Sequence, residues 1–305
     1  MTVRDALREG VAALGASETA FLDASLLLAA ALGLSRTALY AAGPQDLSDS
    51  AEVAYRAYLD ERSGGQSVAY ILGEKEFWGR SFRVDARVLV PRPETELLVC
   101  AAIEAGDVFG AGSAEGRTER RADGSAGRGR PAPRVHEACC GSGCVILSIA
   151  ADRPEWNVSA SDLSEGALAV ARENAFLILA ADRPGGPCLF SKSDLLGSVD
   201  GPFDILIANP PYIPSAEIDG LGPELRREPR LALDGGPDGL DLYRRLVPQA
   251  AARLVPGGTL LLESDGAQAA RLRSLLAEAG FAETSTLRDL AGIERVTLGS
   301  LPWKT

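Results

Sequence analysis

Four consecutive residues near position 210 have the chemistry to hold a planar amino group. The apolar run Ile205-Leu206-Ile207-Ala208 stops at Asn209-Pro210-Pro211-Tyr212. Prolines lack an N–H, and a residue before proline is pushed into an extended conformation, so this corner of the chain is stiff. It displays two acceptors, the Asn209 side-chain oxygen and the Pro210 carbonyl, which suit an –NH2 group that donates twice. Tyr212 can wall the pocket and stack on a flat group.

Such a corner can prepare an amide nitrogen for methyl transfer. The nitrogen is a poor nucleophile because its lone pair is conjugated with the carbonyl. Holding both N–H bonds at acceptors orients the nitrogen toward an incoming methyl group, and positioning is worth up to ~7–11 kcal/mol in favourable cases. No strong base is needed before transfer, because the methylated nitrogen loses a proton easily. The alternative is a proline-stiffened strand end without catalysis.

A second group of residues predicts a site for a nucleoside cofactor. The first strand expected after residue 134 leads into Glu137-Ala138-Cys139-Cys140-Gly141-Ser142-Gly143. Glycines let the backbone approach a ligand and supply amides at a helix N-terminus. Asp162 ends the next strand, about 20 residues on, where an acidic side chain typically holds ribose hydroxyls. Asp194 follows the third strand and can accept from an adenine amino group, with Leu195 offering a backbone amide. The alternatives are a simple loop with a helix cap, and a solvated turn at Asp194.

We expect no metal site in this region. His136, Cys139, Cys140 and Cys144 match no common zinc spacing, and adjacent cysteines point in different directions. His136 belongs to a buried strand and is interpreted as a core residue.

Alternating strands and helices from residue 134 onward must position both groups. The strand-like runs are VHEA, NVSAS, PCLF, FDILIA and GTLLLE, with a final pair near 281–299. This alternation indicates an α/β fold in which helices cover both faces of a parallel sheet. Ligands bind beyond the carboxyl ends of such strands. We therefore expect the Gly-rich turn and the Asn209 corner to lie on the same rim.

Three regions precede the α/β domain predicted for 135–305. Residues 1–72 have helical periodicity and predict a small helical domain, for which a plain bundle without a specific partner is the alternative. Residues 73–105 predict a hairpin around Gly79-Arg80 and a connecting helix. Residues 106–134 are rich in Gly, Arg, Ala and Ser, so we predict a flexible insertion, with a basic contact arm as the alternative.

Composition narrows the class of protein. Of 305 residues, 46% are hydrophobic and 24% charged, as in ordinary globular proteins. The net charge of −11 disfavours binding along nucleic-acid backbones, which needs clustered Lys and Arg. Five scattered cysteines do not form a disulfide framework, and no apolar run resembles a signal peptide or membrane span. We therefore expect a reduced, cytoplasmic protein that binds no membrane.

The motifs together resemble the HemK/PrmC family of class I S-adenosylmethionine-dependent methyltransferases. The resemblance is carried by NPPYIP, by the Gly-rich loop with Asp162, and by VAYILGEKEFWGRSFRVDARVLVPRPETE and EPRLALDGGPDGLDLYRRL. It covers nearly the whole chain except 106–134. It implies a Rossmann-like methyltransferase sheet with a small N-terminal helical domain and a linking β-hairpin. It also implies an enzyme that methylates the N5 of the glutamine in the Gly-Gly-Gln motif of class 1 peptide chain release factors.

The resemblance further implies a role for individual residues. Residues 209–212 would grip the glutamine, with Asn209, Pro210 and Tyr212 catalytic, and the helical domain would dock the release factor. The residues that would bind S-adenosylmethionine are Cys139, Cys140, Gly141, Ser142, Gly143, Asp162, Asp194, Leu195 and Asn209, with Arg92, Glu94 and Thr95 closing its methionine side. We expect a monomer without direct nucleic-acid contacts.

The chain departs from the family motif Asp-Leu-Gly-Thr-Gly-Ser-Gly in places. Glu137 replaces the Asp, Cys139-Cys140 replace Gly-Thr, and Leu195 stands where many relatives have an aromatic residue. Three alternatives remain at this point: a nucleic-acid exocyclic-amine N-methyltransferase, a methyltransferase for a ribosomal-protein glutamine, and an inactive S-adenosylmethionine-binding protein.

Overall fold

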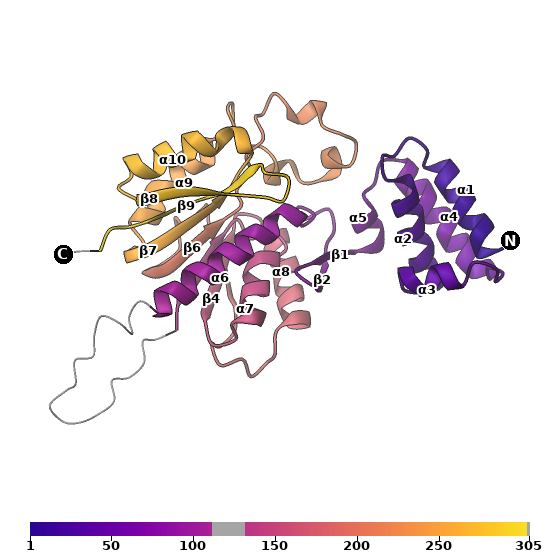
Figure 1. The fold of residues 1–305 in the computed structure, drawn as a ribbon, viewed down its shortest axis with the longest axis horizontal. Coiled ribbons are helices and arrows are strands. Elements are labelled where there is room, and N and C mark those ends of the chain that lie inside the picture. Colours follow the sequence, from indigo (N-terminus) through magenta and orange to yellow (C-terminus); the bar gives the residue numbers. More distant parts are fainter. Residues whose placement is uncertain (112–131, 304–305) are drawn as a thin grey trace.

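A seven-stranded sheet lies at the centre of the larger of two lobes in the computed structural model, which describes residues 1–111 and 132–303 (Figure 1). The strand order is β5-β4-β3-β6-β7-β9-β8. The bounds are β3 (Arg134–Ala138), β4 (Asn157–Asp162), β5 (Leu189–Lys192), β6 (Phe203–Ala208), β7 (Leu254–Glu263), β8 (Ala282–Arg288) and β9 (Glu294–Ser300). Strands β5, β4, β3, β6 and β7 are parallel, as predicted.

The prediction of a parallel sheet is wrong for the final pair of strands. Strand β9 is antiparallel to both β7 and β8. Only a short loop, 289–293, joins β8 to β9, and parallel neighbours would need a crossover of a dozen or more residues. The sheet is therefore mixed, with its antiparallel edge on the far side of β7 from β6.

Helices cover both faces of this sheet, as the sequence predicted. Along β6, Ile205 and Ile207 pack into one apolar cluster, while Leu206 and Ala208 pack into another, because successive strand residues point to opposite faces. The first cluster includes residues of α6 (Glu96–Ala111), α7 (Cys144–Asp152) and α8 (Glu165–Ile178); the second includes residues of α9 (Asp241–Ala251) and α10 (Ala269–Glu278).

Helix α6 corrects the start of the predicted insertion. It continues to Ala111, so residues 106–111 are helical. Gly106 permits this, since a Cβ there would come within 2.1 Å of the Trp156 ring. At the other end, β3 already begins at Arg134. The remainder of the call for 106–134 falls mainly on 112–131, which lie outside the described residues.

The smaller lobe consists of five helices with a core of their own (Figure 1). They are α1 (Val3–Ala13), α2 (Ala20–Leu32), α3 (Arg36–Ala41), α4 (Asp49–Ser63) and α5 (Val68–Leu72). Ser35, Ser48 and Ser67 cap α3, α4 and α5 by accepting from backbone N–H groups. The hairpin of β1 (Glu74–Phe77) and β2 (Arg80–Arg83) then leads into the sheet lobe, as predicted. No helix in the described part of the chain is long and apolar enough to cross a membrane.

A buried guanidinium joins the helical lobe to the loop that follows β6. Arg62 Nε donates to Asp23 at 2.8 Å, and its Nη2 pairs with Glu224. Arg227, in the same loop as Glu224, donates to the Gly64 carbonyl of the helical lobe. Glu224 and Arg227 belong to the loop 209–240 between β6 and α9, which also borders the site described next.

Candidate active site

A cavity of about 310 Å³ opens at the carboxyl ends of β3, β4, β5 and β6. It brings together most of the residues that the sequence predicted for a site: Arg92, Thr95, Cys139, Cys140, Gly141, Ser142, Asp162, Asp194, Leu195, Asn209 and Pro211. Among the predicted residues, Glu94, Gly143, Pro210 and Tyr212 do not line it. The shared rim expected for the Gly-rich turn and the Asn209 corner is therefore present.

The Gly-rich loop turns tightly because three of its residues have a left-handed backbone. Cys139, Gly141 and Gly143 have φ values of +59°, +53° and +77°. A Cβ on Gly141 would meet no protein atom within 4 Å, so the cavity side of this residue is open. A Cβ on Gly143 would instead crowd Leu147 at 3.1 Å and Ala171 at 3.3 Å. Gly141 thus gives access to the cavity, and Gly143 lets α7 pack closely against α8.

Glu137 is a buried carboxyl at the start of this loop. Its Oε2 accepts from the Ile146 N–H at 3.0 Å, in the first turn of α7, where the helix dipole favours negative charge. Burial raises the pKa of Glu137 well above its ordinary value. Glu137 also lines the cavity. Glu137 is not among the predicted site residues, although an acidic side chain directly before a Gly-rich turn is a signal for such a role.

Asp162 is fixed beside the loop by backbone amides. It accepts from Gly141 at 2.9 Å and from Ser164 at 2.8 Å. Burial raises the pKa of Asp162, and these backbone hydrogen bonds oppose the shift. Ser164 caps α8 by accepting from the Ala167 N–H at 3.2 Å. Because a carboxylate offers about four lone pairs, Asp162 keeps acceptor capacity toward the cavity.

Asp194 and Leu195 occupy the turn after β5. Asp194 pairs with Arg245 of α9 at 2.5 Å, and Arg245 also lines the cavity. Leu195 is buried with φ at +54°, and its carbonyl accepts from Ser161 Oγ at 3.3 Å. The turn therefore combines a buried Leu195 with an exposed Asp194 side chain, so the ligand-facing role of Asp194 stays a prediction beside the solvated-turn alternative.

Glycines of the loop that follows residues 209–212 pack closely against the backbone of this corner. A Cβ on Gly235 would come within 2.8 Å of the Pro211 carbonyl, and one on Gly239 within 2.2 Å of the Tyr212 carbonyl. Gln268 also donates to the Tyr212 carbonyl at 2.9 Å. The backbone of residues 233–240 (LDGGPDGL) thus holds the corner in place. The glycine content of this stretch alone did not predict that role.

Tyr212 packs against the apolar cluster around α9 and α10 rather than lining the cavity wall. Burial raises the pKa of its hydroxyl to about 12, so it is protonated at neutral pH. Asn209 is half-buried and faces the cavity, whereas Pro210 is buried. Of the two acceptors proposed from the sequence, the Asn209 side chain is therefore the one that the cavity exposes most directly.

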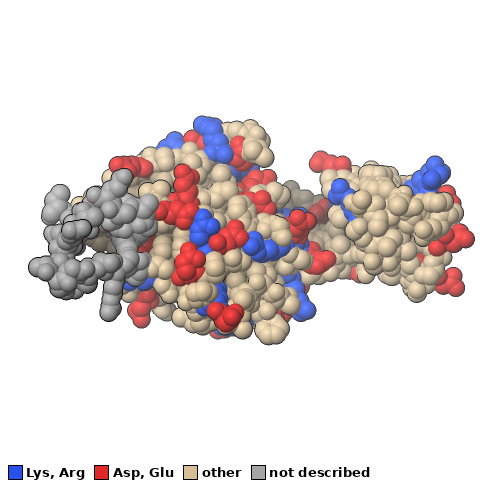
Figure 2. Space-filling view, turned by 60° about the horizontal axis from the view of Figure 1, so that its bottom comes forward, with Lys and Arg blue, Asp and Glu red and all other residues tan. Residues whose placement is uncertain are grey.

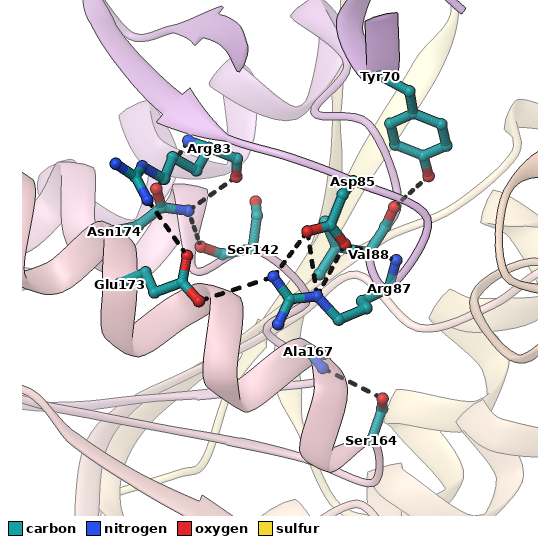
Figure 3. A network of polar contacts seen from close by, with 10 residues as sticks. All are labelled: Tyr70, Arg83, Asp85, Arg87, Val88, Ser142, Ser164, Ala167, Glu173 and Asn174. Carbon is teal, nitrogen blue, oxygen red and sulfur yellow. Dashed lines mark hydrogen bonds and ion pairs between the residues drawn. The ribbon is translucent and has the colours of Figure 1, made fainter. Parts of the chain in front are cut away.

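Asn174 of α8 ties the hairpin to the Gly-rich loop. Its Oδ1 accepts from the Arg83 N–H at 2.7 Å, and its Nδ2 donates to the carbonyls of Arg83 at 3.1 Å and Ser142 at 2.9 Å (Figure 3). Figure 3 also shows Arg87 bridging Asp85 and Glu173 of α8. The segment 84–95 is therefore held over the cavity.

Glu228 joins that segment to the loop 209–240. Its buried carboxyl accepts from the Val90 N–H at 3.0 Å and pairs with the Arg92 guanidinium. Burial raises the pKa of Glu228, and Arg92 opposes the shift. Pro229 and Leu231, just after it, line the cavity. In the described part of the chain, no group of three His, Cys, Asp or Glu side chains has a geometry that could hold a metal ion.

Two protein-family models match parts of this chain. A model of the PrmC N-terminal domain matches residues 5–73, and one of the methyltransferase small domain matches residues 130–222. The release factor glutamine methyltransferase of Bradyrhizobium diazoefficiens is 41% identical over 280 residues, which cover 91% of this chain and 87% of that protein. The chain belongs to the release factor glutamine methyltransferase family.

The same-named protein of Burkholderia pseudomallei is 40% identical over 291 residues, or 95% of each chain. The solved hMettl16 catalytic domain, in complex with MAT2A 3′UTR hairpin 6, aligns with a TM-score of 0.52 at 15% identity, over 79% of this chain and 82% of that one. That likeness concerns the fold alone. The predicted Rossmann-like methyltransferase fold and the resemblance to the HemK/PrmC family are confirmed.

Proposed function

We propose that this protein transfers a methyl group from S-adenosylmethionine to the N5 of the glutamine in the Gly-Gly-Gln motif of class 1 peptide chain release factors, and so modulates translation termination. The observation that supports it most is that one cavity borders both the Gly141 loop and Asn209, so a methyl donor and an amide would share one space. The names of the family's members point to the same substrate.

The residues around the cavity fit S-adenosylmethionine. The volume lies within the usual range of about 300–1,000 Å³ for small-molecule sites. Gly141 leaves space where a side chain would stand, Asp162 can accept from ribose hydroxyls, and the Asp194-Leu195 turn can meet an adenine edge. When bound, S-adenosylmethionine supplies an electrophilic methyl group on a sulfonium sulfur, which keeps the electron pair. The residues proposed to hold it are Arg92, Thr95, Cys139, Cys140, Gly141, Ser142, Asp162, Asp194, Leu195 and Asn209.

On the acceptor side, the protein orients the amide rather than deprotonating it. Asn209 Oδ1 and the Pro210 carbonyl would each accept one N–H of the glutamine side chain. Pro211, which lines the cavity, would limit its movement, while the ring of Tyr212, packed against the cluster around α9 and α10, would hold the corner itself. The close contacts of Gly235 and Gly239 keep the corner from relaxing. After transfer the nitrogen releases a proton to water.

We also propose that the helical lobe docks the release factor, and that the protein works as a monomer in the cytoplasm. Phe21 and Tyr40 support the docking role, because both are exposed and stack at 6.5 Å between ring centroids. Figure 2 shows acidic and basic side chains interspersed on the visible face of the sheet lobe, without a broad basic patch there. Together with the net charge of −11, this gives no support to the nucleic-acid alternative.

Mass spectrometry of a purified release factor, incubated with the protein and S-adenosylmethionine, tests the proposal. We expect the mass of one methyl group on the peptide that contains the Gly-Gly-Gln motif. A release factor with that glutamine replaced by glutamate should remain unmodified. Methylation only at another residue, or only of a ribosomal protein, would contradict the proposal.

A further inference from the structure

Glu263 is a buried carboxyl that stands beside Asn209 at the edge of the sheet. Ala208, the last residue of β6, pairs with Leu262 of β7, so Asn209 directly after β6 and Glu263 at the end of β7 follow a paired position on two neighbouring parallel strands. Glu263 is only 3% exposed. Its backbone carbonyl accepts from the Tyr243 hydroxyl at 2.5 Å, which fixes its position. The mechanism described so far does not use this side chain.

The two oxygens of the Glu263 carboxyl have different surroundings. Oε1 accepts from the Thr95 hydroxyl at 3.0 Å, while Oε2 is buried and has no hydrogen-bond partner in the described residues. The Asn209 side chain acts on the carboxyl and lowers its pKa. Glu263 Oε2, a buried acceptor without a partner in the described residues, therefore belongs to the residue next to Asn209, whose side-chain amide lines the cavity.

The identity of this neighbour decides which way the Asn209 amide points. An asparagine amide has an acceptor oxygen and a donor –NH2, and it can turn so that either faces the cavity. If the –NH2 faced the cavity, it would meet the –NH2 of a glutamine donor to donor. An ionised carboxylate only accepts, so it pairs with the Asn209 –NH2 and leaves Oδ1 for the substrate.

We propose that Glu263 is a positioning residue that, when ionised, holds Asn209 Nδ2 and thereby presents Asn209 Oδ1 to the substrate amide. This inference rests on the proposed function. Thr95 contributes by occupying Oε1, which leaves Oε2 as the acceptor for Asn209. It thereby connects the segment 84–95 over the cavity to the acceptor corner.

Glu263 is also set to titrate near neutral pH. Burial raises its pKa to about 7, while the hydrogen bond from Thr95 and the neighbouring Asn209 side chain lower it. The charged and titratable groups that interact with it from neighbouring elements are Glu94, Glu137, Cys144, Tyr212, Tyr243 and Arg295. Once protonated, Glu263 can donate to Asn209, and the amide is free to turn. Transfer should therefore rise with pH through about 7.

The test compares wild-type protein with Glu263→Gln, using a purified release factor and saturating S-adenosylmethionine between about pH 6 and pH 8. Glutamine can donate or accept, so it no longer selects one amide orientation. We expect kcat at pH 8 to fall roughly 10- to 100-fold, as for loss of a charge-assisted hydrogen bond. The pH dependence near 7 should disappear, and the Kd for S-adenosylmethionine should stay within about two-fold.

Two further variants control this comparison. Glu263→Asp keeps an acceptor-only side chain and should retain a rise of kcat with pH. Glu278→Gln makes the same chemical change at the exposed end of α10 and should match wild type. Since the folded-state pKa of Glu263 lies above its ordinary 4.5, its protonation stabilises the fold at low pH, and that contribution is lost as pH rises to about 7. The Tm of wild type, relative to Glu263→Gln, should fall over this range.

Wild-type kcat and an unchanged pH profile in Glu263→Gln would overturn the inference. If that variant does not fold, the Thr95→Val protein decides. Losing the hydroxyl should raise the pKa of Glu263 and move the midpoint of the rate profile to higher pH, and an unmoved midpoint contradicts the inference. A wild-type protein that binds S-adenosylmethionine but methylates no glutamine at any pH contradicts the proposed function itself, and is recognised without any variant.

Discussion

The two ends of the cavity are built in different ways. The Gly-rich loop at 139–143 depends on backbone conformation: three residues have positive φ, and backbone N–H groups donate to the Asp162 side chain and the Ser161 carbonyl. The corner at 209–212 depends on one side-chain amide and on prolines that cannot relax. The loop can therefore accept unusual side chains such as Cys139, whereas the corner should not accept a change at Asn209.

The largest expected effect is that of Asn209→Ala. Removing the side-chain acceptor takes away the group that orients the amide, and loss of a comparable preorganised partner typically lowers kcat by about 10²–10³. We expect methyl transfer to fall at least that far, with the calorimetric Kd for S-adenosylmethionine changed only a few-fold. Unchanged turnover in this variant would show that the corner does not depend on the Asn209 side chain, and would contradict the difference drawn between the two ends of the cavity.

Asp162→Asn should produce the next largest effect, and on the other end of the cavity. A hydrogen bond to a charged group contributes about 1.5–3 kcal/mol, so the Kd for S-adenosylmethionine should rise roughly 10- to 100-fold. At saturating cofactor, kcat should stay within a few-fold of wild type. Calorimetry measures the Kd and initial rates measure kcat. A fall in kcat with an unchanged Kd would contradict the assignment of Asp162 to the cofactor end of the cavity.

A smaller effect at the corner distinguishes the ring of Tyr212 from its hydroxyl. Since burial holds the hydroxyl pKa at about 12, no ionised form takes part at neutral pH, and Tyr212→Phe should transfer methyl within a few-fold of wild type. Tyr212→Ala removes the ring, and we expect about a ten-fold loss, near the upper limit for one aromatic contact. Equal losses in both initial-rate assays would instead assign the role to the hydroxyl.

The smallest expected effect is that of Cys139→Gly. A left-handed backbone costs a non-glycine residue about 1–2 kcal/mol, while glycine loses about 0.5–1 kcal/mol through the entropy of the unfolded chain. The free energy of unfolding should therefore change by no more than about 1.5 kcal/mol in denaturant titrations, with cofactor Kd within about two-fold. A large loss of affinity would show that the thiol itself contacts the ligand.

Local sequence patterns predicted most helices and strands, but not the contacts between residues far apart in the chain. The sequence predicted β6 and the corner after it correctly, because an apolar run ended by two prolines has few other structures. It missed Glu228, Asn174 and Glu263, whose partners lie 136, 91 and 168 residues away in the chain. Their roles arise only when the segment 83–95 folds over the sheet, which no periodicity encodes.

The most direct test of the central claim is a crystal structure of the protein with S-adenosylhomocysteine and a peptide containing the Gly-Gly-Gln motif. We predict that the glutamine nitrogen lies within about 3.2 Å of both Asn209 Oδ1 and the Pro210 carbonyl oxygen, at ordinary hydrogen-bond distance. A glutamine side chain bound away from this corner, or one that meets the Asn209 –NH2 through its own carbonyl oxygen, would contradict the account.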